Sequence, residues 1–217
     1  MSPKASAELR ELIQHLLARV PEQHDLNAAE RQAVYSAMGS WQRGGVGHRR
    51  RARLAIYSAK RVLPLIECFV PGSWSRALIL LAQQILEGKQ DTTYVSLLLM
   101  ERWRAWLGED LQAVKDLLRL YRPLGSRQTE ETLVTVEQAA HAAVQALAVT
   151  LWDEFEVEML LREHPGTTLE YWRSSDTAGW AWLAEREKDA HHLQNGDAFW
   201  DWYLREAVPR AWASEVV

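Results

Sequence analysis

Cysteine is nearly absent from this sequence, and long apolar runs are missing. The chain of 217 residues holds one cysteine, Cys68, so no disulfide can form within it, which is typical of a reducing compartment. Its most apolar stretch, Ala77 to Leu86, is far shorter than the ~20 residues of a membrane-spanning helix. The opening MSPKASAELRELIQ lacks the apolar core and cleavage pattern of a signal peptide. We therefore expect a soluble, cytoplasmic protein without a membrane partner.

An excess of positive charge is also missing. The net charge of -4 and the pI near 6.0 argue against a general nucleic-acid binder, whose domain is usually basic. Hydrophobic residues make up 47% of the chain and charged residues 25%, which is the composition of a folded protein with a sizeable core. Tryptophan is unusually frequent, with eleven residues. Such large aromatic side chains fill gaps between helices or anchor interfaces.

No segment alternates apolar and polar residues for long enough to suggest a strand. Apolar residues recur instead at helical spacing, as in the stripe of Leu9, Leu12, Ile13, Leu16 and Leu17 before Pro21. The sequence predicts an all-α fold: a single domain over residues 1–217 with about nine or ten helices, arranged as an irregular bundle or as stacked helical hairpins. We divide it into an N-terminal helical extension (1–48), central helices (49–163) and aromatic-rich C-terminal helices (164–217).

Capping residues and helix breakers predict the helix boundaries. Asn27 and Glu30 have the spacing of a capping box, so a helix should begin there and run towards Trp41. Segment 129–163 contains no glycine or proline and is predicted to be one uninterrupted helix. The other predicted features are caps at Ser73, Asp91 and Asp197, breaks at Pro64, Gly108 and Asn195-Gly196, and a bend or end at Pro209.

Catalytic motifs are not recognisable in the chain. The loop Gly44-Gly45-Val46-Gly47 lacks the Gly-Lys-Ser/Thr ending of a P-loop and follows no strand, so a flexible connection is favoured. There is no Gly-x-Ser-x-Gly elbow, and Cys68 is predicted to be a small core residue. The Glu–His pairs of the sequence have neither di-iron nor zinc-hydrolase spacing. We assign no catalytic, cofactor-binding or metal-binding residue and no cofactor.

A basic segment follows the glycine-rich loop. From Arg31 to Ile66 there are eight Lys or Arg and no acidic residue. Four arginines lie especially close together: Arg49, Arg50, Arg51 and Arg53. They are candidates for binding phosphates or an acidic protein surface. Alternatively, they form a solvated helix start or pair with the acidic half of the same chain.

An acidic segment provides the opposite charge. Nine Asp or Glu and one Arg lie between Gln128 and Glu170. Four of the carboxylates crowd into two helical turns: Asp153, Glu154, Glu156 and Glu158. Glu154 and Glu158 lie one turn apart on the same helical face. These residues are our first candidates for a partner-binding surface, because complementary charge raises association rates, and the alternative is a solvated face.

The doubled tryptophans indicate two different environments. Trp103 and Trp106 are three residues apart, so both should face the core. In the pairs Trp180 with Trp182 and Trp200 with Trp202, the partners diverge by about 200° on a helix. One member of each pair is therefore expected to be exposed or to contact another layer, where an exposed Trp could anchor an interface.

Two segments together resemble a known family. The first is Arg61-Val-Leu-Pro-Leu-Ile-Glu67, followed by a turn with Pro71 and an apolar helix ending in Glu87-Gly88. The second is Phe199-Trp-Asp-Trp-Tyr-Leu-Arg-Glu-Ala-Val-Pro-Arg-Ala-Trp212. Their combination resembles an all-helical family of immunity proteins from bacterial polymorphic toxin systems. The resemblance implies a protein that binds and neutralises a cognate toxin, and it brings no catalytic motif. The region before Arg49 departs from the family as an extension.

Three functions remain open at this point. The first is an immunity protein that blocks a toxin by surface complementarity, and the acidic helix would suit the basic active site of a nuclease toxin. The second is a helical adaptor or scaffold without a toxin partner. The third is an enzyme that holds a phosphorylated substrate through Arg49 to Arg53. We favour the first, which is a protein-binding role and not an enzymatic one.

Overall fold

Helices make up all the regular structure in residues 3–120, 126–163, 174–186 and 192–213, which the computed structural model describes. Side chains are described for residues 7–99, 101–120, 129–153, 175–182 and 197–213. The elements are α1 (Pro3–Gln23), α2 (Ala28–Ala37), α3 (Val46–Val62), α4 (Pro64–Glu67), α5 (Trp74–Leu86), α6 (Thr92–Leu120), α7 (Ser126–Glu163), α8 (Ser174–Arg186), α9 (His192–Trp202), the π-helical turn η1 (Tyr203–Ala207) and α10 (Val208–Ala213). The predicted all-α fold is confirmed.

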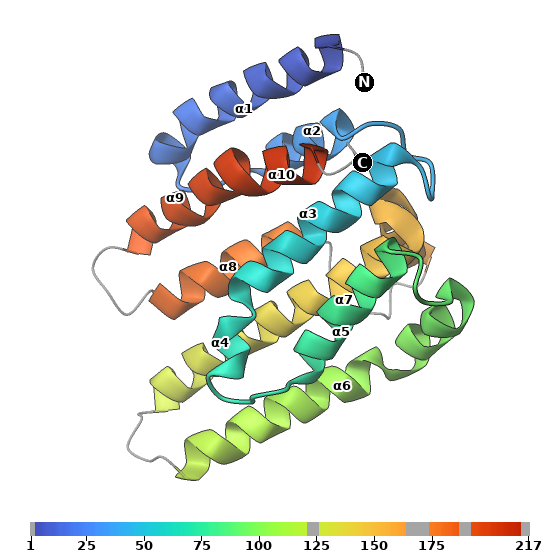
Figure 1. Ribbon diagram of the computed structural model, residues 1–217. Helices are drawn as coiled ribbons and strands as arrows, with labels where there is room; N and C mark the ends of the chain where they lie inside the picture. The colour runs from blue at the N-terminus through green and yellow to red at the C-terminus, as the bar shows by residue number, and fades with distance from the viewer. Residues whose placement is uncertain (1–2, 121–125, 164–173, 187–191, 214–217) are drawn as a thin grey trace.

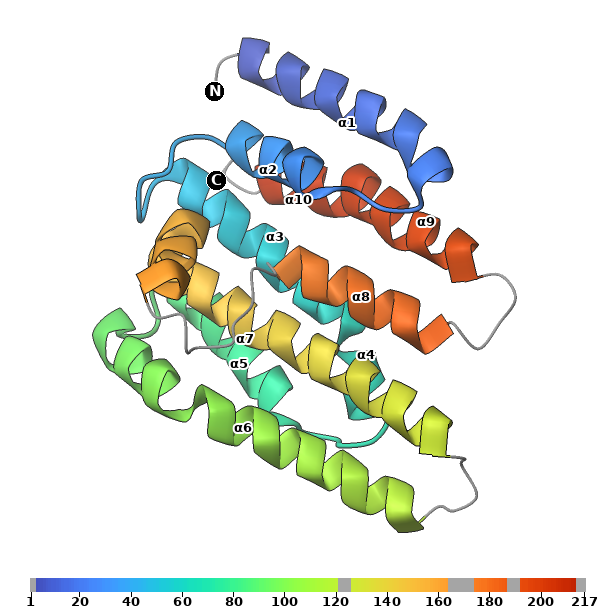
Figure 2. The same cartoon turned by 180° about the vertical axis from the view of Figure 1, so that it is seen from behind.

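The helix α7 lies in the middle of the molecule. It packs against α3, α5, α6 and α8. Nearly all of its alanine-rich stretch 139–151 is buried, and small side chains there let the neighbouring helices approach closely. The helices are layered from α1 at one edge, past α9, α10 and α3, to α6 at the opposite edge, and the view from behind shows the same order (Figures 1 and 2). None of the described helices is long and apolar enough to span a membrane.

Capping side chains begin α2 and α5 where the sequence predicts. Asn27 Oδ1 accepts a hydrogen bond from the Glu30 N–H at 3.1 Å, and the Asn27 N–H donates to Glu30 Oε2 at 2.8 Å. These bonds satisfy N–H groups that a helix start leaves unpaired. Glu30 is buried and also pairs with Arg19 of α1 at 2.6 Å, so the cap joins two helices. Ser73 accepts a hydrogen bond from the Arg76 N–H at the start of α5.

Replacing Asn27 with alanine is expected to lower the free energy of unfolding by about 1 kcal/mol, because the Glu30 N–H loses its acceptor. Urea unfolding followed by circular dichroism measures the change. The variant Asn27→Asp keeps an acceptor oxygen and serves as the control, with an expected change of less than about 0.5 kcal/mol. Equal midpoints for the alanine variant and the wild type would show that the capping box does not stabilise the fold.

Proline and glycine differ in their effect on the helices. Pro64 separates α3 from α4, as predicted, because proline lacks the N–H that would continue the helix. Gly108 does not separate two helices, and the predicted break there is wrong. A glycine inside a helix costs about 1 kcal/mol but removes no hydrogen bond. The buried face of α6 continues across it from Trp106 to Asp110, which stabilises one continuous helix.

The C-terminal helices also differ from prediction at one boundary. The helix α9 begins at His192 and includes Asn195-Gly196, so the predicted break there and the predicted start at Asp197 are wrong. The predicted bend near Pro209 is present as η1, in which the Val208 N–H donates to the Tyr203 carbonyl five residues earlier. Proline has no N–H and would clash with the carbonyl four residues before it in a regular helix, and π-turns are one way of bending a helix.

The helix predicted over 129–163 is interrupted at one residue. Asp153 has φ 62° and ψ 157°, so α7 consists of two helical parts that meet there. A positive φ is strained for a residue with a Cβ atom, and such a residue persists where its surroundings hold it. The prediction of an uninterrupted helix is therefore wrong, and the residue at the break is the one whose side chain binds Arg51, as described below.

The tryptophan side chains follow the predicted division. Trp103 and Trp106 are buried, as their spacing predicts. Trp180 is 51% exposed, whereas Trp182 is half-buried. Trp200 is buried between Phe199 and Tyr203, and Trp202 is half-buried. Each pair with a spacing of two is thus divided between two environments, as predicted.

Candidate partner-binding site

Arg51 of α3 and Asp153 of α7 form a buried ion pair. Arg51 is fully buried and Asp153 is 2% exposed. The Arg51 Nε atom donates to Asp153 Oδ1 at 2.8 Å, and Nη2 donates to Oδ2 at 2.7 Å. This two-pronged geometry is the strongest in which a guanidinium binds a carboxylate. The alternative that the basic and acidic segments pair with each other is therefore confirmed for these two residues.

The remaining donors of Arg51 bind backbone carbonyls. Its Nη1 atom donates to the carbonyls of Tyr35 at 3.2 Å and Gly39 at 3.0 Å, and Nη2 donates to that of Ser40 at 2.8 Å. All five N–H groups of the guanidinium are thus in use. The Trp41 ring covers the group, with its centroid 3.9 Å from Cζ. Arg51 therefore joins the end of α2 to α3 and α7, and offers no donor to a phosphate or a partner.

The neighbouring arginines of the predicted basic set differ in exposure. Arg50 is buried, donates to the Met38 carbonyl at 3.0 Å, and has its Cζ atom 3.6 Å from the centroid of the Trp212 ring. Arg49 is partly exposed and donates to the Gly44 carbonyl at 2.6 Å, and Arg53 is also partly exposed. A partner that docks on the folded surface thus cannot reach Arg50 or Arg51. These two residues are therefore removed from the basic set of candidate partner-binding residues.

The predicted acidic set divides at the break in α7. Asp153 is buried against Arg51, so it cannot contact a docked partner, and it drops out of the proposed acidic surface. Glu154, Glu156 and Glu158 follow on the second helical part of α7, and their side chains lie outside the described ones. The buried ion pair with Arg51 holds Asp153 in place, and the helical part that carries these three glutamates begins directly after Asp153.

The glycine-rich loop is held by His48. The imidazole Nδ1 atom accepts a hydrogen bond from the Gly44 N–H at 2.8 Å, and Nε2 donates to the Val149 carbonyl at 2.8 Å. With one nitrogen accepting and the other donating, the bonds describe a neutral ring. The Gly44 N–H therefore points at a side chain of the same protein and is not available to a phosphate. A hollow of about 210 Å³ beside the loop is lined by Arg43, His48, Arg49, the last residues of α5, the first residue of α6 and an interior stretch of α7 just before Asp153.

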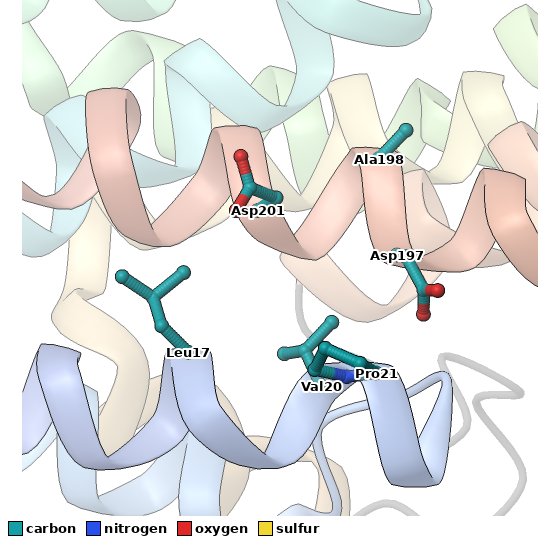
Figure 3. Close-up of a pocket in the computed structure, with 6 residues that line it drawn as sticks. All are labelled: Leu17, Val20, Pro21, Asp197, Ala198 and Asp201. Carbon is teal, nitrogen blue, oxygen red and sulfur yellow. The ribbon is translucent and has the colours of Figure 1, made fainter.

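A second hollow of about 300 Å³ lies between α1 and α9 (Figure 3). It is lined by Leu17, Val20, Pro21, Asp197, Ala198 and Asp201. Asp197 pairs with His24 at 3.0 Å, and Asp201 pairs with Arg205 at 2.6 Å. Both carboxylates therefore have a side-chain partner within the chain. The hollow is open and lacks the several convergent polar groups that define a small-molecule site.

Buried carboxylates among the described side chains serve the fold. The pairs are Glu30 with Arg19, Asp110 with the N–H groups of Trp74 and Ser75, Asp153 with Arg51, and Asp176 with Arg31. Within the described residues, no three His, Cys, Asp or Glu side chains are grouped so that they could hold a metal ion. Cys68 is exposed, so its predicted place in the core is wrong. It lies between the short helix α4 and the turn before α5, where the chain runs along the surface.

One arginine lies over two tryptophan rings at the surface of α3, α8 and α9. Arg61 is exposed, and its Cζ atom lies 4.6 Å from the ring centroid of Trp182 and 5.1 Å from that of Trp202. We call these three residues the arginine–tryptophan platform. Among the described side chains, no carboxylate lies within ion-pair distance of Arg61.

Two further cations lie next to the platform. The Arg210 Cζ atom of α10 lies 4.9 Å from the centroid of the Tyr57 ring. Burial and the nearby Arg210 guanidinium lower the pKa of the Lys60 ammonium below its usual range, and Glu87 opposes this effect. Lys60, the neighbour of Arg61 on α3, and Arg210 of α10 are thus two cations close enough to repel each other.

The platform was not among the residues predicted from the sequence. Its members nevertheless come from the segments that carry the family resemblance: Arg61 opens the first, and Trp202 lies in the second. The two segments are far apart in the chain but meet in space where α9 approaches α3. The two segments thus contain Arg61 and Trp202, whereas Trp182 lies outside both of them.

In its described residues the protein is thus all-helical, and its surface carries charged and aromatic patches. The family model of the immunity protein Imm5 matches residues 13–210. The chain therefore belongs to the Imm5 family of immunity proteins, and the resemblance seen in the sequence is confirmed. Because the match begins at residue 13, most of the region before Arg49 belongs to the family region, contrary to expectation. No curated protein and no solved structure is significantly similar to the chain.

Proposed function

We propose that this chain is an immunity protein that neutralises a cognate bacterial toxin by binding to it. The observation that carries the proposal is the family match over residues 13–210, nearly the whole chain. Binding alone is sufficient for such a role, because a protein that covers the active site of a toxin prevents access of the substrate. The protein would act in the cytoplasm of the cell that produces the toxin.

The acidic helical part after Asp153 is the proposed toxin-binding surface, now reduced to Glu154, Glu156 and Glu158. Three carboxylates close together would complement the basic active site of a nuclease toxin and speed the association of the two proteins. The net charge of -4 favours the same kind of partner. In support, the Arg51–Asp153 pair anchors the residue at which this helical part begins.

The basic alternative receives less support. Of Arg49, Arg50, Arg51 and Arg53, the second and third are buried and hold backbone carbonyls of their own chain. An enzyme that binds a phosphorylated substrate through these arginines would need their N–H groups at the surface. We therefore propose a contribution to toxin binding from Arg49 and Arg53 at most.

Co-expression tests the proposed function. A candidate toxin, sought among the genes that adjoin the gene of this chain, is induced in a sensitive bacterium with and without the protein, and growth is followed. Growth should be restored when the protein is present, and the two proteins should elute together in size-exclusion chromatography. Equal killing with the protein present in soluble form at a level above that of the toxin would contradict the proposal.

Charge reversal tests the acidic surface. The double variant Glu154→Lys with Glu158→Lys is expected to weaken toxin binding by about 100-fold, or roughly 1.4 kcal/mol for each charge, since both residues share a helical face. Isothermal titration with a catalytically inactive toxin measures the affinity. The control is Glu8→Lys with Glu11→Lys, an exposed pair on α1, which should change it less than about threefold. Similar affinities for both double variants would show that the surface lies elsewhere.

A further inference from the structure

The arginine–tryptophan platform has the properties of a prepared anchor. A guanidinium over an aromatic face is attracted by the negative face of the ring. Contact with two rings restricts the rotamers of the long side chain before any partner arrives, so less entropy is lost on binding. The N–H edge of a guanidinium lies in its plane and stays available for a bidentate bond to a carboxylate.

Among the described side chains, none provides a counter-charge for Arg61. Arg61 has no carboxylate within ion-pair distance among the described side chains, whereas Arg31, Arg51 and Arg76 each have at least one. Lys60 is adjacent in sequence, and burial and the Arg210 guanidinium lower the pKa of its ammonium, although the Glu87 carboxylate opposes the shift. Repulsion of this kind destabilises the free protein and is relieved when an anion binds. Such an arrangement is typical of a surface whose counter-charge comes from another molecule.

We propose that Arg61, supported by Trp182 and Trp202, binds a carboxylate on an acidic face of the toxin, with Lys60 and Arg210 adding long-range attraction. This inference rests on the proposed function and assigns a second contact to it. The residue types match, because Arg, Trp and Tyr dominate the few positions that carry most of the energy of protein interfaces. The platform lies near the C-terminal end of α3, away from the Arg51–Asp153 pair near its start. It is therefore separate from the acidic surface.

An acidic protein fits this surface better than a nucleic acid does. Proteins bind single-stranded nucleic acid by stacking bases on open aromatic faces. Here the guanidinium lies over both rings, and Trp182 and Trp202 are half-buried, so neither ring is open for stacking. The chain as a whole is negatively charged, which opposes a polyanion but not a local carboxylate.

Substitution of Arg61 tests the inference in the full chain, with a catalytically inactive form of the toxin identified by co-expression as probe. Arg61→Glu should weaken toxin binding by about 100-fold, because it places a carboxylate against the carboxylate of the partner. Arg61→Lys keeps the charge but loses the planar fork, and should weaken binding by about tenfold. Arg104→Glu is the matched control, since Arg104 is exposed and its Cζ atom lies 5.3 Å from the Trp103 ring on α6; binding should change less than about twofold.

A second variant tests the platform with a substitution that is not expected to destabilise the fold. Lys60→Gln relieves burial and repulsion of a cation, so its melting temperature should equal or exceed that of the wild type, while toxin binding weakens by about fivefold. If Arg61→Glu and Lys60→Gln both bind within about twofold of the wild type, the platform is not a contact and the inference is overturned.

The failure of the inference can be told apart from that of the proposed function. A wild type that neither binds the toxin nor restores growth contradicts the function itself. A wild type that binds a 12-nucleotide single strand as tightly as the toxin, with loss in Arg61→Glu, overturns the assignment to a protein carboxylate. Loss of toxin binding in Arg61→Glu, with Arg104→Glu unaffected and no binding of the single strand, supports it.

Discussion

Replacing Asp153 with alanine is expected to lower the free energy of unfolding by about 3–5 kcal/mol. The substitution leaves the Arg51 guanidinium buried without its counter-ion, since Arg51 is fully buried and donates two hydrogen bonds to this carboxylate. The strained φ of 62° remains, but the bonds that hold it are gone. Urea unfolding with linear extrapolation measures the loss, and an unchanged dependence on urea would show that the effect is on stability alone.

Asp116→Ala is the matched control for this experiment. Asp116 pairs with Arg119 at 3.0 Å, but both side chains are exposed, so its loss should be less than about 1 kcal/mol. Adding Arg51→Met to Asp153→Ala should not restore stability. The carbonyls of Tyr35, Gly39 and Ser40 would then lose their donor as well. A loss for Asp153→Ala no larger than that for Asp116→Ala would contradict the structural role of the pair.

Replacing Gly47 with alanine is expected to lower the free energy of unfolding by about 3 kcal/mol. A Cβ atom at this position would lie 2.4 Å from the Ser40 carbonyl oxygen and 2.8 Å from the Gly39 carbonyl carbon. Both contacts are with backbone that cannot move without breaking the bonds from Arg51 to these carbonyls. Differential scanning calorimetry should show a fall of roughly 6–12 °C in the melting temperature, at 2–4 °C for each kcal/mol.

The control for Gly47 is a glycine with free space around it. Gly108 is exposed inside α6, and a Cβ atom there would meet nothing within 4 Å. Gly108→Ala should therefore raise the free energy of unfolding by up to about 1 kcal/mol. A fall in melting temperature of similar size for both alanine variants would contradict the steric explanation.

The parts of the fold that were predicted correctly depend on signals within one or two helical turns. The capping box at Asn27 and the break at Pro64 act on neighbouring backbone groups, so sequence alone reveals them. Gly108 does not break α6, because the small local cost of a glycine is outweighed by the packing of the whole helix face. The break at Asp153 depends on Arg51, which is distant in sequence, and no local pattern indicates it.

The candidate site was predicted in part. Opposite charges in the basic and acidic segments were recognised, but a row of charges does not show which members are buried. Successive residues of a helix point about 100° apart, so Arg49 is partly exposed while Arg50 and Arg51 face the interior. The platform requires α3, α8 and α9 to meet, and that contact follows from tertiary packing and not from any one segment.

The Arg51–Asp153 pair also sets an order of events during synthesis. Its two residues are 102 positions apart in the chain. At roughly 5–20 residues per second, a ribosome adds Asp153 about 5–20 s after Arg51. Until then Arg51 has no counter-ion to accompany it into the interior, so the contact that joins α2, α3 and α7 forms late in translation. Trp202 follows Asp153 in the sequence and completes the platform later still. The two contacts that define the proposed binding surfaces are therefore complete only after Trp202 has been added to the chain.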